Sequence, residues 1–288
     1  MTAATSIVGA KVGPVPLRRH SRLLGWLGRH GLTAVALISI VYLLAPIVMM
    51  IVLSFNRTEG RFDFVWRGFS VAAWLQPFAV DGLVDSLKIS IALACVVALI
   101  ATAIGTAMAY AQVRHRFVGR QILDIILLLT ISTPEVIIGS ALLNLYLGLR
   151  LPMGWLTLVL SHVMFDIAFV AIVVKSRLRG FDITLEQAAM DLGARGPRVF
   201  RKITLPLILP AVVTAGLLAF MLSLDDFIIT MFVSGATVTF PLFVWGTARV
   251  AMPPQIYVVG TAIFVILSLL LLGSFLLDRR RARLRQAG

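Results

Sequence analysis

The chain has 288 residues, of which 59% are hydrophobic and 14% charged, and its formal net charge is +13. A soluble domain of this size needs a polar surface, so the composition excludes ordinary water-soluble folds and indicates a membrane protein. The basic residues lie in clusters between apolar runs, as in membrane proteins, which argues against nucleic acid as a partner.

Six long apolar runs predict the secondary structure. A helix needs about 20 such residues to cross roughly 30 Å of hydrocarbon, and the runs do not alternate as barrel strands would. The chain is therefore expected to be an all-α integral membrane protein with six transmembrane helices, near residues 31–53, 84–113, 121–147, 153–174, 205–233 and 257–277. The first run exceeds the roughly 7–15 apolar residues of a signal peptide, so we expect an uncleaved span.

The segments between these runs predict the orientation. Twenty of the 26 Lys and Arg residues fall in four places: the N-terminus 1–30, the turn 114–120, the loop 175–205 and the tail 278–288. Because basic loops stay in the cytoplasm, both termini are expected there. The segment 54–83 is then extracytoplasmic, and 84–277 forms a core of five spans.

Small residues recur at helical spacing in the second span. Such stripes let helices approach closely, so this one favours packing against either another subunit or another helix of the same chain. Its members are Ala94, Ala98, Ala101, Gly105 and Ala109. The single cysteine, Cys95, lies in the same run and cannot form an intrachain disulfide.

The loop 175–205 is expected to contain two short helices. Asp182 or Thr184 can cap a helix over 185–192, and Gly193 suits a helix end that needs positive φ. Pro197 can open the second helix, and Pro206 stands at the start of the fifth span, where a missing N–H does little harm. Two short helices at the cytoplasmic face form a shape suited to docking another protein.

This loop resembles the EAA loop of ATP-binding-cassette (ABC) importer permeases, which carries Glu-Ala-Ala, three residues, Gly, nine residues, and Ile-x-Leu-Pro. The motif's glutamate position holds Gln187, with Glu186 one place earlier, so the chain departs from the pattern at its polar residue. The remaining positions match at the expected spacing: Ala188, Ala189, Gly193, Ile203, Leu205 and Pro206.

The resemblance extends over most of 84–277 and is greatest to spermidine and putrescine permeases, through 185–194, 223–227 and 232–235. It implies a permease subunit with the MetI-like, type I importer fold in a bacterial inner membrane. Related permeases for iron(III), thiamine or phosphonate compounds share much of the pattern, so the solute stays open.

The resemblance also implies the partners. These are a homologous second permease, two ATPase subunits that bind ATP and Mg, and an extracytoplasmic substrate-binding protein. The loop would dock on the ATPase as a coupling helix. The chain has no Gly-x4-Gly-Lys-Ser/Thr phosphate loop, so we expect no nucleotide cofactor in it and no enzymatic activity of its own.

Acidic residues inside spans are costly, so each is a candidate for the substrate pathway. Asp225 and Asp226 are adjacent and point about 100° apart on a helix, so both could edge a central cavity. Carboxylates with aromatic walls suit the ammonium groups of a polyamine. Alternatively, one of the two caps a helix break or pairs with an arginine of the partner permease.

Glu135 and Asp166 are further pathway candidates with structural alternatives. Glu135 follows Thr133 and Pro134, which look like the N-cap and first residue of a restarted helix. Asp166 has His162 one turn earlier and could pair with it. Nothing in the pattern indicates a catalytic set or a metal site. A stand-alone secondary transporter would need inverted repeats, and the sequence has no clear one.

Overall fold

A computed structural model describes residues 22–57, 65–180 and 182–286. Within these ranges the regular structure is helical, apart from one isolated antiparallel bridge between Asn56 and Phe69. The chain divides into two compact units: Met1–Leu53 with Gly260–Gly288, and Ser54–Val259. Parts of the expected N-terminus 1–30, of the segment 54–83, of the loop 175–205 and of the tail 278–288 lie outside the described residues.

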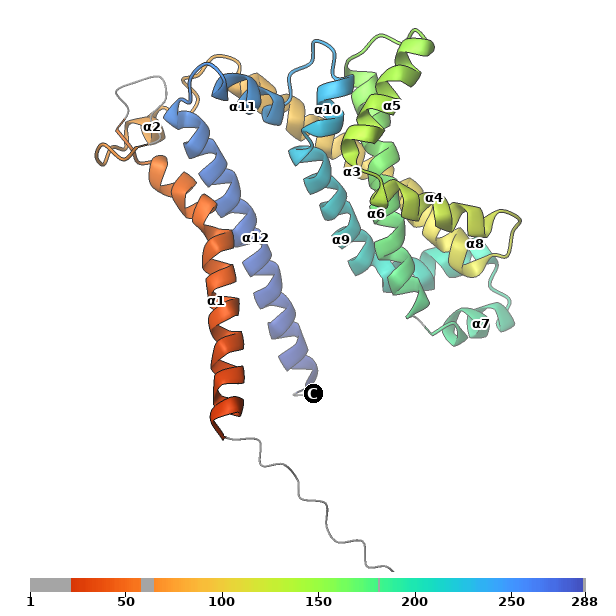
Figure 1. Cartoon of the computed structure of the whole chain (residues 1–288). Coiled ribbons are helices and arrows are strands. Elements are labelled where there is room, and N and C mark those ends of the chain that lie inside the picture. The colour runs from red at the N-terminus through yellow and green to blue at the C-terminus, as the bar shows by residue number, and fades with distance from the viewer. Residues whose placement is uncertain (1–21, 58–64, 181, 287–288) are drawn as a thin grey trace, which may run out of the picture. The chain divides into compact units, whose positions relative to one another are not determined.

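The first unit contains helix α1 (Arg22–Leu53) and most of helix α12 (Pro254–Gln286), both drawn in Figure 1. The two helices approach closely at Gly260, where an added Cβ would lie 2.9 Å from the Met50 sulfur. The apolar stretch Thr33–Leu53 is almost entirely exposed, with Leu53 at its end buried, as expected for a helix whose surroundings are lipid or another subunit.

The core of the second unit is a three-helix layer of α3 (Leu83–Arg114), α6 (Trp155–Arg179) and α9 (Leu205–Asp225). Gly105 makes the close approach of α3 to α6 possible, because a Cβ there would lie 2.7 Å from Cγ1 of Val170. Most of the small-residue stripe faces this core, so it packs mainly inside the chain. The buried members are Ala94, Ala101, Gly105 and Ala109.

The third apolar run folds as two helices, α4 (Arg120–Ser132) and α5 (Glu135–Gly148), bent by 109° at the break. The expected restart at Glu135 is confirmed, but the expected capping is wrong by one residue. Pro134 is the N-cap, and the Thr133 hydroxyl donates backward to the Leu129 carbonyl at 2.6 Å. The helix break arises because proline lacks an N–H and restricts the residue before it.

The fifth apolar run is also broken, which the sequence did not predict. Helix α9 ends at Asp225, and the short helix α10 (Ile228–Val233) follows. Helix α10 packs on α5 so closely that a Cβ at Gly139 would lie 2.5 Å from the Phe232 ring. Two broken runs therefore meet in one region of the second unit, and α11 (Phe240–Ala248) follows them in the chain.

By length and composition, four described helices could cross a membrane, or five if α4 and α5 count as one span. Helix α12 is not part of that count, because its described apolar stretch Pro254–Ile266 is shorter. The all-helical fold is confirmed, whereas the number six is not established by the described residues.

The segment 54–83 is organised by side-chain contacts around the short helix α2 (Ala72–Leu75). The Asn56 side chain donates to the Val65 carbonyl at 2.9 Å and accepts from the Arg67 N–H at 2.8 Å. Phe55 stacks on Trp74 with ring centroids 5.3 Å apart. The segment is thus an ordered connection where it is described.

Candidate functional site

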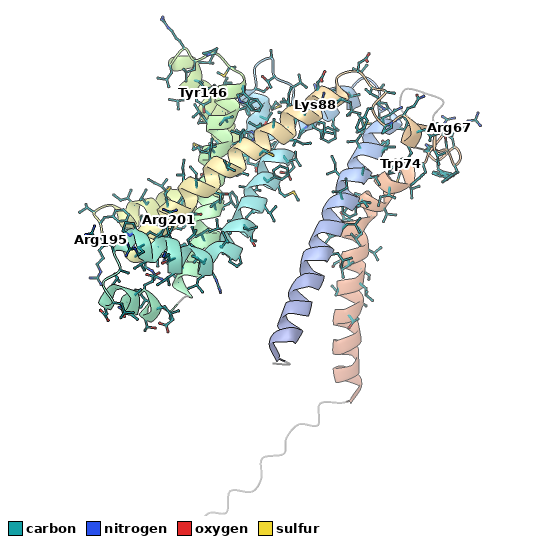
Figure 2. All side chains as sticks on the ribbon, turned by 180° about the vertical axis from the view of Figure 1, so that it is seen from behind. Arg67, Trp74, Lys88, Tyr146, Arg195 and Arg201 are labelled. Atoms are coloured by element: carbon teal, nitrogen blue, oxygen red, sulfur yellow. The ribbon has the colours of Figure 1, made fainter. Side chains whose placement is uncertain are left out.

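The motif-bearing loop forms a helical segment in the second unit. It comprises α7 (Thr184–Asp191), α8 (Gly196–Val199) and a π-helical turn, η1 (Phe200–Thr204), which leads directly into α9. Gly193 has φ +84°, and Pro197 lies in the first turn of α8, as the sequence predicted. Figure 2 places Arg195 and Arg201 of this segment at the opposite end of the unit from Tyr146 and Lys88.

The start of α7 is fixed by Asp182, whose carboxylate accepts the Thr184 backbone N–H at 3.0 Å. This hydrogen bond lowers the pKa of the Asp182 carboxyl below its ordinary value, because it stabilises the charged form. A capping role for Asp182 was one of the two possibilities that the sequence left open.

Glu186 is the buried residue of the motif, with 4% of its surface exposed. One carboxylate oxygen accepts the Thr204 hydroxyl at 2.8 Å, and the other pairs with Arg114 Nε at 2.9 Å. Arg114 is the last residue of α3, and Thr204 ends the π-helical turn. The carboxylate therefore joins α7 and η1 to α3, which is distant in the sequence.

Gln187, which occupies the motif's glutamate position, is exposed, as is Ala188. Neighbouring apolar side chains are also exposed in the described chain: Leu192 at 89% and Leu185 at 52%. Met190 is 48% exposed. Exposed apolar side chains on a segment rich in arginine favour a protein interface.

The remaining motif positions lie at the junction with α9. Leu205 packs against the core formed by α3, α6 and α9. Ile203 is half-buried, and Pro206 is exposed in the first turn of α9. Ala189 is half-buried on α7. These residues connect the segment to the helix layer, while Gln187 and Leu192 face outward.

The four acidic pathway candidates come together where the two broken runs meet. Asp225 and Asp226 lie at the break between α9 and α10, and Glu135 lies at the break between α4 and α5. Helix α10 contacts both α5 and α6, and the Asp226 carboxylate lies 3.3 Å from Nε2 of His162, one turn before Asp166 on α6. The sequence identified these residues one by one, and the fold gathers them into one acidic cluster.

Asp226 is a helix cap. Its carboxylate accepts the Thr230 backbone N–H at 2.8 Å and the Thr230 hydroxyl at 2.7 Å, and it lies 3.4 Å from the Ile229 nitrogen. His162 Nε2 lies 3.3 Å from the same carboxylate. The capping alternative proposed for one of the two aspartates is therefore the correct description of Asp226.

The ring nitrogens of His162 bond to residues other than Asp166. Its Nδ1 shares a 2.8 Å hydrogen bond with the Ser223 hydroxyl, and its Nε2 lies 3.0 Å from the Thr230 hydroxyl. The expected His162–Asp166 pair is wrong because α10 folds back over α6 and brings better-placed partners.

Asp166 is buried, with 1% of its surface exposed, and its Oδ2 atom has no hydrogen-bond partner among the described residues. Asp225 and Glu135, by contrast, are exposed in this chain. The cluster thus combines a capping carboxylate, two exposed carboxylates and one buried carboxylate. In the part of the chain that the structure describes, no three His, Cys, Asp or Glu side chains could hold a metal ion.

Aromatic side chains adjoin the cluster. Phe227 follows Asp226 directly, and its ring packs on Trp245 with centroids 5.2 Å apart. The Arg249 guanidinium lies 4.6 Å from the Trp245 ring centroid, so this ring already hosts one cation. Tyr146 is buried and hydrogen-bonded to Ser161 at 2.9 Å, which assigns it to the core.

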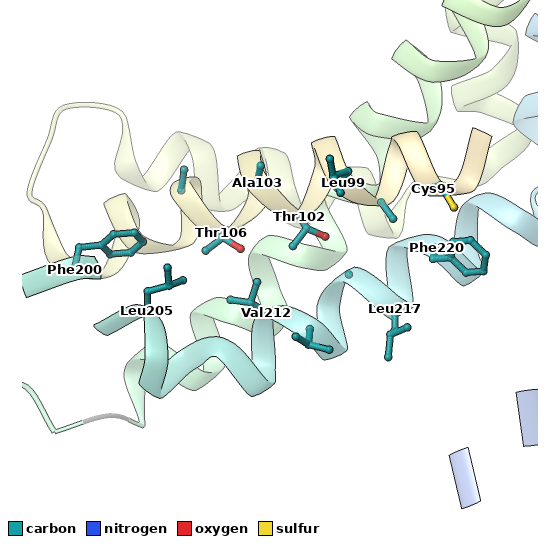
Figure 3. A pocket seen from close by; sticks show the side chains of 14 residues that line it. Cys95, Leu99, Thr102, Ala103, Thr106, Phe200, Leu205, Val212, Leu217 and Phe220 are labelled. Atoms are coloured by element: carbon teal, nitrogen blue, oxygen red, sulfur yellow. The ribbon is translucent and has the colours of Figure 1, made fainter. Parts of the chain in front are cut away.

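A groove of about 730 Å³ runs between α3 and α9 (Figure 3), and its chemistry separates it from the acidic cluster. Its walls are apolar side chains, Cys95 and the hydroxyls of Thr102 and Thr106, with no charged residue. Such a surface suits a helix or a lipid chain. It does not suit a polycation, so the cluster is the better candidate for the pathway.

Sequence reasoning missed Arg114, Thr204, Ser223 and Thr230. Each is a common residue type whose role depends on a partner distant in the sequence. Only Arg114 carried a signal, because an arginine at the end of an apolar run can pair with an acidic residue of a loop such as 175–205.

Comparisons with known proteins agree with this arrangement. A family model described as "Binding-protein-dependent transport system inner membrane component" matches residues 101–286. The chain is 34% identical over 243 residues to the spermidine/putrescine transport system permease protein PotC of Escherichia coli K12, covering 84% of this chain and 91% of that protein. It is 36% identical over 237 residues to the putrescine transport system permease protein PotI of the same strain, covering 80% and 84%.

The fold is also similar to a chain in the crystal structure of a bacterial ABC transporter that imports the acidic polysaccharide alginate. The TM-score is 0.62 at 17% identity, with 91% of this chain and 99% of that chain covered. The helix arrangement, the loop motif and the matched length agree, and the chain belongs to the family of binding-protein-dependent transport system inner membrane components.

Proposed function

We propose that this chain is one permease subunit of an ABC importer for polyamines such as spermidine and putrescine. The observation that carries the proposal is the acidic cluster of Glu135, Asp225 and Asp226 at the two helix breaks, together with the buried Asp166 of α6. The names of the 34% and 36% identical relatives support the substrate class.

The division of roles within the cluster follows from its contacts. Asp226 is engaged in the cap of α10, whereas Asp225 and Glu135 are exposed toward whatever completes the pathway. Attraction between unlike charges strengthens as the dielectric falls. Exposed carboxylates between helices can therefore attract a flexible polycation without holding it through a rigid set of ligands.

We further propose six spans with both termini in the cytoplasm. The spans are α1, α3, the bent pair α4 and α5, α6, α9 and α12. The basic clusters support this orientation. The proposed organisation keeps 31–53 as the first span, 54–83 as the extracytoplasmic segment and 84–277 as the five-span core. The termini 1–30 and 278–288 are then cytoplasmic.

The partners follow from the need for an energy source and a solute donor. A second, homologous permease would complete the pathway, and an extracytoplasmic binding protein would deliver the solute. Two ATPase subunits would carry the ATP and Mg, one of them docking on the outward residues of α7, such as Gln187 and Leu192. In this scheme the chain itself holds no cofactor and catalyses no reaction.

Uptake of radiolabelled spermidine tests the proposal in a strain that carries the complete importer with a substituted permease. We expect Asp225→Asn to lower uptake at least tenfold at equal permease abundance, because the change removes an exposed charge that forms no ion pair with another described residue. The matched control is Asp85→Asn, since Asp85 is an exposed carboxylate paired with Lys88 on the surface. Normal uptake by the Asp225 variant would contradict the pathway assignment.

A further inference from the structure

The link between α7 and the rest of the permease is narrow. Its main packing neighbours are α8 and η1, and in the chain it follows α6. The Glu186 side chain adds a polar bridge to α3, because Arg114 is the last residue of that helix. A force applied to α7 can therefore enter the helix layer through these contacts and through the chain connection to α6.

The bridge is buried on both sides. The Arg114 and Glu186 side chains are 10% and 5% exposed, and Thr204 is fully buried. A buried carboxylate that loses its cationic partner is strongly unfavourable, because a single charge in a dry environment lacks compensation. The three groups are therefore expected to move together during a conformational change.

The bridge also contacts the π-helical turn η1. Thr204 is the last residue of the π-helical turn η1, and its hydroxyl donates to Glu186. Single π-helical turns inside helices frequently occur at functional sites. The ring of Phe200 in this turn packs edge-on against Tyr110 of α3, with centroids 4.7 Å apart. Both ends of the turn are thus linked to α3: Phe200 packs on it directly, and Thr204 is linked to it through Glu186.

We propose that Glu186 is a positioning residue. It holds the coupling helix α7 to the cytoplasmic ends of α3 and α9, so that α7, α3 and α9 move together as one rigid unit. The neighbouring Gln187, at the motif's usual glutamate position, faces outward and carries the contact with the partner. The two adjacent residues therefore have different roles. Gln187 contacts the ATPase subunit, and Glu186 transmits the resulting movement of α7 to the rest of its own chain. This inference rests on the proposed docking of an ATPase at α7.

The test uses the complete importer reconstituted in proteoliposomes, with three measurements on each variant. These are retention of the ATPase subunit on the purified permease, the ATP hydrolysed in the presence of the loaded binding protein, and the spermidine transported per ATP. The variants are Glu186→Gln, which keeps an acceptor for Thr204 but removes the charge, and the exchange Arg114→Glu with Glu186→Arg.

For Glu186→Gln we expect the spermidine transported per ATP to fall at least fivefold while the ATPase subunit stays bound. The exchange variant, which restores an opposite-charge pair, should recover at least half of the native ratio. Gln187→Ala should show the reverse pattern, with the ATPase subunit lost from the complex. A merely structural role for Glu186 would lower permease yield and leave the ratio of the surviving complexes native.

Four outcomes would overturn the inference: a native ratio in Glu186→Gln, loss of the ATPase subunit from that variant, no recovery in the exchange variant, or native subunit retention in Gln187→Ala. Failure of the proposed function itself has a different signature. In that case the native complex would move no spermidine, while all variants would hydrolyse ATP alike.

Discussion

Replacing Asp226 with alanine should destabilise the permease through loss of the cap that starts α10. The carboxylate accepts the backbone N–H and the hydroxyl of Thr230 at 2.8 and 2.7 Å, and it lies 3.3 Å from His162 Nε2. The helix cap contributes about 1–2 kcal/mol. Leaving a buried donor without its acceptor costs about 1–3 kcal/mol more.

These contributions overlap, because His162 and the Thr230 hydroxyl keep a hydrogen bond to each other at 3.0 Å. We therefore expect a total loss of about 2–4 kcal/mol for Asp226→Ala. Asp226→Asn keeps one carbonyl oxygen that can accept the Thr230 N–H, so its loss should be about half as large. Asp225→Ala, which removes a neighbouring carboxylate without capping contacts, serves as the control and should stay near the native value.

Unfolding in mixed micelles with increasing SDS gives the free-energy differences directly. The variant Thr230→Val removes the hydroxyl partner alone, so combining it with Asp226→Ala should give less than the sum of the two single losses. If Asp226→Ala unfolded at the same SDS concentration as the native permease, the capping description would be refuted. A double variant whose loss is strictly additive would also refute it.

Three other expectations follow from the packing and the exposed surface. Gly105→Ala should lower stability by about 1–3 kcal/mol in the same unfolding assay, because the added Cβ overpacks against Val170. Gly246→Ala is the control and should not lower stability, since a Cβ there meets nothing within 4 Å. Leu192→Ser should weaken binding of the ATPase subunit about tenfold or more, since burying a leucine contributes about 1.5–3 kcal/mol; Val118→Ser, an equally exposed position on another turn, is the control for this binding measurement. Trp245→Ala should lower spermidine uptake severalfold if the ring also contacts the substrate, and unchanged uptake would remove Trp245 from the pathway.

Much of the fold is predictable from the sequence because lipid imposes simple rules. Apolar length defines the helices, so the expected second span at 84–113 corresponds almost residue for residue to α3. Local backbone chemistry predicts the loop equally well: Gly193 adopts the expected positive φ, and Pro197 opens α8. These signals depend only on near neighbours in the chain.

The candidate site could be predicted only in part, because its contacts join distant segments. Asp226 looked equally suited to the pathway and to a cap, and the choice depends on where α10 folds, which apolarity does not encode. The break at Asp225 carries no proline or glycine, so no local signal marked it. Likewise, the position of Gln187 in the motif gave no indication that Glu186 is the residue buried against Arg114.

The most direct test of the account is ATP-dependent spermidine uptake by purified components in proteoliposomes. The native permease pair, with the ATPase inside and the binding protein outside, should accumulate spermidine only when all are present, and Asp225→Asn should abolish most of that uptake. Uptake by the permease chain without the ATPase subunit would contradict the account, as would a complete complex that hydrolyses ATP but moves no polyamine.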